Sequence, residues 1–317
     1  MRIAITGASG FIGGAIVRQL ILSGHQAVAL VRNATHHFPK AVKQIEIGDL
    51  SQLDESRLTS VFQSIKGFDA IIHTAALAHK KDMRADYANQ VDKVNVQATA
   101  LLAQLASQYE IGRFIFLSSI GVNGSVSTQA FVEQDPPNPH NLYSKCKYQA
   151  EQQLLALASQ SDLEVVIVRP PLVYALDAPG NFAKLIKLIK TTLPLPFKNT
   201  NNQRSFIALD NLVDFLLLCA DEKSTPLAKN QVFLIADDQS ISTEQLTRNI
   251  AGALGVKLHL VYINHKILLF FLSLVNKKQL YTQLFESLTI DNSKAKAMLN
   301  WQPKTTMEQQ LNKHSVD

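Results

Sequence analysis

The sequence TGASGFIGG at residues 6–14 decides the fold of this chain. It follows a short apolar run and precedes residues 11–22, in which apolar side chains recur with the period of a helix. Its glycines at every third position, Gly7, Gly10 and Gly13, permit a tight turn and a close approach of the backbone to a pyrophosphate. The N–H groups at the start of the helix then face the negative charge. A strand, a glycine turn and a helix in this order predict a dinucleotide-binding site, and a plain glycine-rich turn is the alternative.

Strand-like and helix-like segments alternate through the first half of the chain. Short apolar runs predict strands at residues 2–6, 27–31, 44–47, 70–73, 114–117 and 165–168, and helical periodicity predicts helices at 11–22, 91–109 and 143–159. Such alternation is typical of right-handed βαβ units. The sequence therefore predicts an α/β fold with a Rossmann-type, doubly wound parallel sheet that has helices on both faces.

The pattern becomes less regular after residue 170, where proline and asparagine appear in loops between helical pieces. We assign residues 1–170 to a dinucleotide-binding Rossmann domain and residues 171–317 mainly to a smaller C-terminal α/β lobe that binds substrate. Residues 207–236, with a predicted helix at 211–220 and a strand at 231–235, are expected to return to the first domain.

Composition excludes several classes of protein. Of the 317 residues, 46% are hydrophobic and 18% charged, which excludes a disordered chain. The net charge of +5 is mild, and without a basic stripe it argues against nucleic-acid binding. Cys146 and Cys219 are far apart and lack the spacing of a metal site, so we expect free thiols, no metal and a reducing compartment. No signal peptide is evident, and a cytoplasmic location is expected.

The most apolar stretch, residues 267–275, is nine residues long and too short to span a bilayer. Lys266 precedes it, and Lys277 and Lys278 follow. We predict a buried or lid helix here, with a helix that touches a membrane surface as the alternative.

The spacing GxxGxxG resembles that of the extended branch of the short-chain dehydrogenase/reductase superfamily, whose members bind NAD or NADP. Arg32 directly follows the second predicted strand, at a position where an acidic residue would hydrogen-bond the adenosine ribose. Because a guanidinium holds a phosphate in a bidentate fork, Arg32 favours NADP(H), and NAD(H) remains possible. By resemblance, Asp49 accepts a hydrogen bond from the adenine amino group, and the small residues 74–76 lie along the cofactor. The expected cofactor-binding residues are Gly7, Ser9, Gly10, Phe11, Ile12, Gly13, Arg32, Asp49, Leu50, Thr74, Ala75, Ala76, Asn95, Tyr143, Lys147 and Pro170.

The catalytic residues are expected where a predicted strand and helix meet. Tyr143 and Lys147 have the YxxxK spacing, which places them on one face of a helix. An ammonium near the phenol favours the phenolate, so Tyr143 can act as an acid and base. Ser118 and Ser119 follow a strand, at the edge where ligands bind in open α/β sheets. Their separation from Tyr143 matches the Ser–Tyr–Lys arrangement of the superfamily and favours Ser119, so the expected catalytic residues are Ser119, Tyr143 and Lys147.

The second half of the chain resembles the nucleotide-sugar branch of this superfamily. The resemblance rests on RPPLVY at 169–174, QRSFIALDNLVD at 203–214 and WQP at 301–303. It implies that Arg204 and Asn181 bind the substrate diphosphate and that the backbone around Pro196 faces the nucleobase. The expected substrate-binding residues are Ser118, Ser119, Asn123, Asn181, Pro196 and Arg204. His79, Lys80 and Lys81 either border the sugar or form a solvated loop.

Within this branch the chain resembles a bacterial group of surface-polysaccharide (lipopolysaccharide O-antigen) synthesis. The group includes UDP-glucose and UDP-N-acetylglucosamine 4-epimerases and the 4-keto reductases that form UDP-N-acetylquinovosamine. One departure is Gly121, where that group has lysine. A homodimer is possible, since dimers are common in the superfamily.

The resemblance implies chemistry at C4 of a nucleotide sugar, with a UDP-N-acetylhexosamine as the expected substrate. We favour a 4-keto reductase because of Arg32, with a 4-epimerase that retains NAD as the alternative. A 4,6-dehydratase is disfavoured because Ile120 and Gly121 are not acidic. A non-catalytic NADP(H)-sensing protein is the alternative from another class, although Tyr143 and Lys147 are both present.

Overall fold

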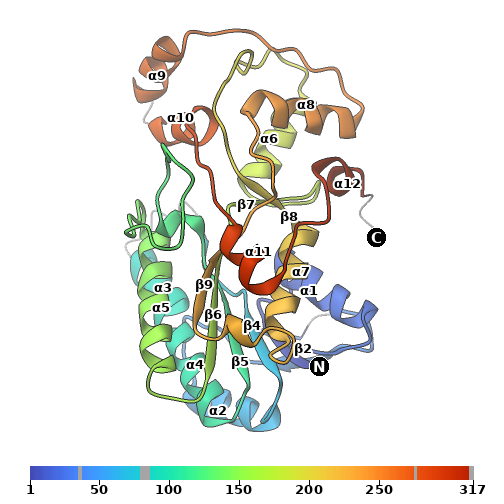
Figure 1. Ribbon diagram of the computed structural model, residues 1–317, viewed down its shortest axis with the longest axis vertical. Coiled ribbons are helices and arrows are strands. Elements are labelled where there is room, and N and C mark those ends of the chain that lie inside the picture. Colours follow the sequence, from blue (N-terminus) through green and yellow to red (C-terminus); the bar gives the residue numbers. More distant parts are fainter. Residues whose placement is uncertain (35–37, 79–85, 275–276, 314–317) are drawn as a thin grey trace.

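The computed structural model describes residues 1–34, 38–78, 86–274 and 277–313 and has a parallel sheet of seven strands at its centre (Figure 1). The strand order is β3-β2-β1-β4-β5-β6-β9, and each neighbouring pair is parallel. The strands are β1 (Arg2–Thr6), β2 (Gln26–Val31), β3 (Lys43–Glu46), β4 (Ala70–His73), β5 (Arg113–Leu117), β6 (Glu164–Arg169) and β9 (Gln231–Leu234). The predicted doubly wound α/β fold is confirmed.

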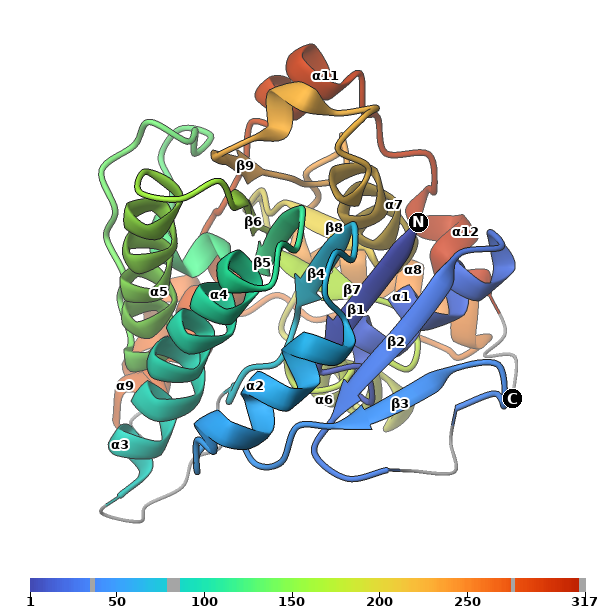
Figure 2. The ribbon, with the colours of Figure 1, turned by 90° about the horizontal axis from the view of Figure 1, so that it is seen from below.

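Helices cover both faces of this sheet (Figure 2). On one face lie α1 (Phe11–Leu22) and α7 (Leu209–Ala220), which pack against alternate strand residues such as Ile3 and Ile5. The other face, which includes Ala4, packs against a second set of helices. These are α2 (Glu55–Ser64), α4 (Ala98–Gln108) and α5 (Leu142–Ala158). Strands that are buried on both faces explain the continuous apolar runs in the sequence.

The helix expected at residues 91–109 is interrupted in the structure. It begins as α3 (Tyr87–Asp92), passes through a π-helical turn at Lys93–Gln97 and continues as α4. Asn95 lies in this turn, and its side chain bonds both the N–H and the carbonyl of Leu77, at 2.8 and 3.1 Å. The turn therefore fixes the segment that follows β4, as π-helical turns often do at functional sites.

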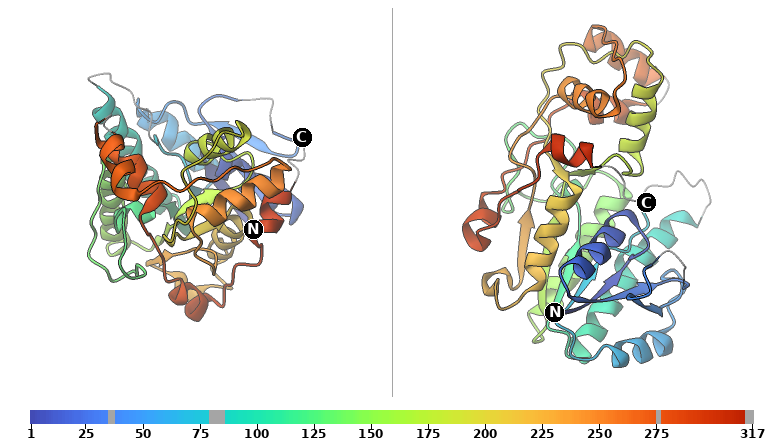
Figure 3. Two further views of the ribbon diagram at one scale, coloured as in Figure 1. Left: turned by 90° about the horizontal axis from the view of Figure 1, so that it is seen from above. Right: turned by 90° about the vertical axis from the view of Figure 1, so that its right-hand side faces the viewer.

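The smaller lobe begins where β6 ends, and the molecule is elongated in the direction of that lobe (Figure 3). It contains a two-stranded parallel sheet of β7 (Leu172–Tyr174) and β8 (Phe206–Ala208). Its helices are α6 (Asn181–Lys190), α8 (Thr243–Leu254), α9 (His265–Leu274), α10 (Lys278–Phe285) and α12 (Met307–Asn312). Two segments of this half of the chain belong with the large sheet instead. The first comprises α7 and β9, and the second is α11 (Ser293–Leu299), which packs near β9.

Helix α9, where a buried or lid helix was expected, is buried on one side only. Ile267, Phe270, Phe271 and Leu274 expose between 53% and 67% of their surface. The opposite side of the helix, which includes Leu268, packs against the core of the smaller lobe. In the described residues, no helix is both long and apolar enough to cross a membrane.

Candidate active site

The glycine turn after β1 leaves no room for side chains. Gly7 has φ +69°, and a Cβ there would lie 2.7 Å from the nitrogen of Ala75. A Cβ on Gly13 would lie 2.7 Å from the carbonyl carbon of Gly7 and closer still to its oxygen. Gly10 is the N-cap of α1 and makes no side-chain cap, while Ser9 and Gly10 are exposed. A bare backbone at the start of a helix fits the pyrophosphate of a dinucleotide.

The ends of β2 and β3 lie next to each other. Arg32 Nε is 3.6 Å from a carboxylate oxygen of Asp49, and 70% of the Arg32 side chain is exposed. The main-chain N–H of Ser51 donates to Asp49 at 2.8 Å and is the main cause that lowers the pKa of this carboxyl group. Leu50 packs in the core between the sheet and α2. Arg32, which was expected to hold a 2′-phosphate, therefore pairs with Asp49, which was expected to bind adenine.

The end of β4 lies against the glycine turn. Thr74 donates to the carbonyl of Thr6 at 2.8 Å, and residues 74–77 are half-buried. His73 is buried between the hydroxyls of Thr6 and Thr99, at 2.6 and 3.0 Å. Burial, and to a lesser extent the charge of Lys147, lowers its pKa to about 3, so His73 is a neutral packing residue. His79, Lys80 and Lys81 lie outside the described residues.

The three expected catalytic residues meet where β5 ends and α5 begins. Ser119 follows β5 and is the N-cap of the short helix Ile120–Val122, whereas Tyr143 and Lys147 lie on the first turns of α5. Lys147 Nζ is buried, donates to the carbonyl of Leu117 at 2.7 Å and lies 5.8 Å from the centre of the Tyr143 ring. On the other side of this junction, Ile120 N donates to the carbonyl of the buried Pro170 at 2.9 Å.

Gly121 lies between Ser119, which follows β5, and the first turn of α5. Its N–H donates to Ser119 Oγ at 3.1 Å. A Cβ at this position would lie 3.3 Å from Ser119 Oγ and 3.2 Å from the Cβ of Ser144. A side chain here would press on Ser119 and on the first turn of α5, so glycine permits the close packing that this chain shows.

The electrostatics of the site differ from the expectation for Tyr143. Burial raises the pKa of Tyr143 to about 12, whereas we expected the neighbouring ammonium to lower it. Burial also lowers the pKa of Lys147 to about 7, against the opposing charge of Glu151. Burial thus outweighs the attraction between the phenolate and the ammonium.

A buried network behind the catalytic residues was not predicted. Glu151, one turn after Lys147, accepts two hydrogen bonds from Arg169, at 2.9 and 2.5 Å, and one from the Ser118 hydroxyl. Arg169 also donates to Asn123 at 2.9 Å. Ser118 and Asn123, which were expected to bind substrate, are almost fully buried, and their side chains form hydrogen bonds within this network. The spacing of Tyr143, Lys147 and Glu151 at every fourth residue is the sequence signal that identifies this carboxylate.

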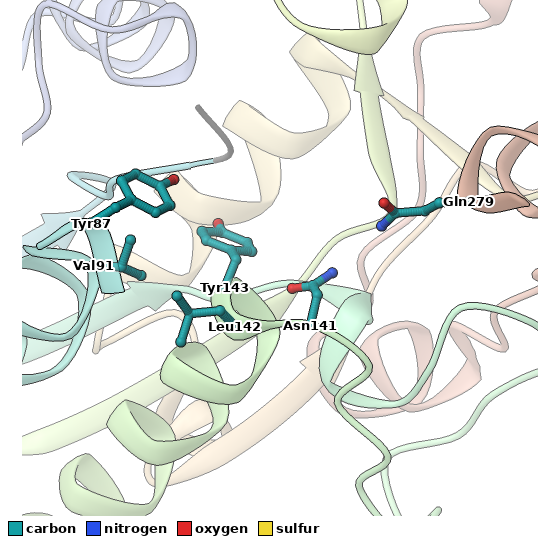
Figure 4. A pocket seen from close by; sticks show the side chains of 6 residues that line it. All are labelled: Tyr87, Val91, Asn141, Leu142, Tyr143 and Gln279. Carbon is teal, nitrogen blue, oxygen red and sulfur yellow. The ribbon is translucent and has the colours of Figure 1, made fainter. Parts of the chain in front are cut away.

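A cavity of about 200 Å³ opens beside Tyr143 (Figure 4). Tyr87 and Val91 of α3 and Asn141 and Leu142 at the start of α5 line it on one side. Gln279 of α10, which approaches from the smaller lobe, lines it on the other side (Figure 4). The sequence did not indicate that α10 takes part in this site.

Helix α10 also contacts both residues that were expected to bind the diphosphate. Asn181 Nδ2 donates to Gln283 at 3.1 Å, and Arg204 Nη1 donates to the main-chain carbonyl of Glu286 at 2.8 Å. Burial lowers the pKa of Arg204 to about 10, which leaves the guanidinium charged. Pro196, which was expected near the nucleobase, directly follows Leu195 and is half-buried. The structure therefore gathers Asn181 and Arg204 around α10, the helix whose Gln279 lines the cavity beside Tyr143.

The described residues contain no cluster of histidine, cysteine and carboxylate side chains that could hold a metal ion. Cys146 and Cys219 are buried free thiols. The glycine turn, the ends of β2 to β4 and the Ser–Tyr–Lys group together fit a dinucleotide and acid–base chemistry.

Known proteins that are similar to this chain agree in family and fold. The NAD dependent epimerase/dehydratase family model matches residues 3–236. A UDP-glucose 4-epimerase of Vibrio cholerae is 34% identical over 312 residues, which cover 97% of this chain and 92% of that protein. An N-acetyl-alpha-D-glucosaminyl-diphospho-ditrans,octacis-undecaprenol 4-epimerase of Escherichia coli O157:H7 is 25% identical over 265 residues, 82% of this chain and 75% of that protein. The solved structure of a Thermus thermophilus UDP-glucose 4-epimerase in complex with NAD has a TM-score of 0.77 at 20% identity, with 98% of this chain and 97% of that chain covered.

Proposed function

The chain belongs to the NAD-dependent epimerase/dehydratase family, and from this premise we propose that it is an oxidoreductase acting at C4 of a nucleotide sugar, in the form of a UDP-sugar 4-epimerase that retains NAD. The observation that carries the proposal is the meeting of Ser119, Tyr143 and Lys147 beside a cavity that the smaller lobe closes with Gln279. The Vibrio cholerae relative, similar over nearly the whole chain, supports the choice of reaction.

The side chains of the site have distinct roles in this reaction. Tyr143 takes the proton of the sugar 4-hydroxyl and returns it after the ketone has presented its other face. Ser119 Oγ accepts a hydrogen bond from Gly121, so its own hydrogen is available to donate to the sugar O4. Lys147 is held by Leu117 beside Tyr143, where its charge favours the phenolate. The nicotinamide, when bound, accepts and returns the hydride at C4.

The substrate diphosphate is proposed to lie between α10 and the start of α6. Asn181 and Arg204 each donate a hydrogen bond to a residue in α10 or directly after it. Binding of a diphosphate would replace these internal partners with charged oxygens, which form stronger bonds with a guanidinium. Because Gln279 is on the same helix, α10 links the diphosphate to the cavity beside Tyr143.

The pair of Arg32 and Asp49 favours NAD over the NADP that the sequence suggested. A 2′-phosphate beside Arg32 would also lie near the Asp49 carboxylate, which is 3.6 Å from the guanidinium. Repulsion between the phosphate and this carboxylate opposes binding. Retained NAD in turn fits an epimerase, which returns the hydride to the substrate and needs no exchange of cofactor.

A 4-keto-sugar reductase that uses NADPH is the second candidate. It is favoured by the exposure of Arg32, whose side chain is free to move away from Asp49 toward a phosphate. For either reaction we propose that the sugar diphosphate is attached to uridine, so that the substrate is a UDP-sugar. The Escherichia coli relative is named for a substrate on undecaprenol, so a lipid-linked sugar is the alternative carrier to test.

The purified protein distinguishes these reactions. The cofactor released on denaturation is identified, and the protein is then given UDP-glucose, UDP-N-acetylglucosamine or undecaprenyl-diphosphate N-acetylglucosamine. An epimerase releases NAD and converts one of these sugars to its C4 epimer without net change in nicotinamide absorbance. Consumption of NADPH with UDP-4-keto-6-deoxy-N-acetylglucosamine would identify the reductase. Cofactor binding without turnover of any of these compounds would contradict both candidates and favour a sensor.

A further inference from the structure

Helix α9 has two apolar faces, and one of them is exposed. Ile267, Phe270, Phe271 and Leu274 follow the i, i+3, i+4, i+7 spacing and form a single stripe along the helix. This stripe, the α9 stripe, is 53–67% exposed, whereas the opposite face packs on the lobe. A helix with apolar residues on both faces is normally buried, so the exposure of the α9 stripe in the described structure is unusual for its composition.

Exposed apolar side chains concentrate in this part of the surface. Among the described residues, eight of the fifteen exposed large apolar side chains lie within residues 261–280. Besides the α9 stripe, these eight are Val261, Tyr262, Ile263 and Leu280. Helix α9 lies at the outer end of the smaller lobe, with α10 between it and the large domain (Figure 1). The patch is therefore on a protruding part of the molecule and is accessible to a flat partner.

The charged residues that flank the α9 stripe in sequence are basic. Residues 245–285 contain five lysines and arginines and no aspartate or glutamate; Arg248 pairs with Glu244 just before this segment, and Glu286 follows it. Lys266, Lys277 and Lys278 flank the stripe in sequence and are exposed. Apolar side chains beside lysines are the pattern by which helices bind the interface of an anionic bilayer.

We propose that the α9 stripe and its flanking lysines dock on the surface of a phospholipid bilayer that contains anionic lipids. A second copy of the chain fits this surface less well, because a two-fold interface would bring the lysines of both copies together. A bilayer offers both an apolar interior for the phenylalanines and negative head groups for the lysines. The inference does not depend on which reaction the site catalyses.

Co-sedimentation of the whole protein with vesicles tests the proposal. We expect binding to vesicles of phosphatidylcholine with phosphatidylglycerol, weak binding to phosphatidylcholine alone, and weaker binding at high salt. The double variant Phe270→Ser/Phe271→Ser should lower the partition coefficient about tenfold or more, because two exposed rings are lost. Lys277→Gln/Lys278→Gln should lower binding to anionic vesicles and leave binding to phosphatidylcholine unchanged.

Leu22→Ser is the matched control, because Leu22 is 81% exposed but lies on α1, away from the α9 stripe. This variant should bind vesicles like the original chain. Circular dichroism and cofactor binding confirm that each variant is folded. Equal vesicle binding by all variants would overturn the proposal, as would no binding by the original chain. Loss of a concentration-dependent dimer in Phe270→Ser/Phe271→Ser, without vesicle binding by the original chain, would assign the stripe to a second copy instead.

Discussion

Lys147 Nζ donates a hydrogen bond to the main-chain carbonyl of Leu117, and the two atoms are 2.7 Å apart. This bond ties the first turns of α5 to the last residue of β5, two positions before Ser119. The ammonium also lies 4.3 Å from the centre of the Phe116 ring, which provides a cation–π contact. The lysine thereby holds together β5 and α5, the elements that position Ser119 and Tyr143.

Replacement of this lysine should remove activity. Lys147→Met deletes the charge beside Tyr143 and the bond to Leu117, so we expect kcat to fall about 10²–10⁴-fold. Loss of the cation disfavours the phenolate, so the acidic limb of the kcat profile should move to higher pH. Steady-state kinetics across pH measure both effects. Lys145→Met is the control, since Lys145 is exposed on another face of α5, and its kinetics should match those of the original chain.

The ionisation of Tyr143 should depend on the cofactor. Burial by the surrounding chain raises the pKa of Tyr143 to about 12. A positively charged nicotinamide nearby favours the phenolate, so its pKa should be lower when oxidised cofactor is bound. The difference in phenolate absorbance between the original chain and Tyr143→Phe isolates this group. The same titration with and without cofactor would contradict the proposed place of the nicotinamide.

The buried pair of Glu151 and Arg169 should be important for stability. Glu151→Gln leaves the Arg169 charge buried without its counterion, so the free energy of unfolding should fall by about 3–5 kcal/mol. Denaturant unfolding measures this change. In the control Glu244→Gln, the lost partner is Arg248, which is more than half exposed, and the cost should stay below about 1 kcal/mol. Similar losses in the two variants would show that the buried network is not a major determinant of stability.

Two neighbouring glycines should respond differently to alanine. A Cβ on Gly13 would meet the Gly7 backbone at 2.7 Å, so Gly13→Ala should displace the glycine turn and weaken dinucleotide binding by about tenfold or more. A Cβ on Gly14 would lie 3.5 Å from its nearest neighbour, the carbonyl oxygen of Ala8. Gly14→Ala should keep binding and stabilise α1 by up to about 1 kcal/mol. Calorimetric titration with cofactor and thermal unfolding compare the two variants.

Cofactor choice should respond to Asp49. Asp49→Asn removes the negative charge 3.6 Å from Arg32 and leaves the guanidinium without its counterion. A 2′-phosphate then meets less repulsion, so the affinity for NADP(H) relative to NAD(H) should rise about fivefold, as expected for one exposed ion pair. Adding Arg32→Ala should reverse this gain. An unchanged affinity ratio in Asp49→Asn would mean that neither side chain faces the adenosine ribose.

Local patterns in the sequence were sufficient to predict the large domain. Each strand at the centre of the sheet is buried on both faces, so its apolar run is visible without knowledge of its neighbours. The turn after β1 was also predictable, because Gly7 needs φ of +69° and Gly13 needs contact with the Gly7 backbone. Both requirements act between residues that are close in sequence.

Contacts between distant residues were not predictable in the same way. Arg32 and Asp49 each suggested a separate role at the cofactor, and their pairing depends on the parallel alignment of β2 and β3. The pKa of Tyr143 was expected to be lowered by Lys147, but burial by the surrounding chain raises it. Hydropathy predicted a buried or lid helix at residues 267–275, yet within the described part of the chain the outer face of α9 is exposed.

The sequence by itself determined the order of strands and helices and the glycine turn, and it selected Ser119, Tyr143 and Lys147 as candidates, because periodicity and spacing are properties of neighbouring residues. The tertiary structure alone decided that α10 closes the cavity beside Tyr143 and that Glu151 pairs with Arg169. It also left the α9 stripe open to solvent. These features arise from packing between segments far apart in the chain, which no local pattern of side chains can specify.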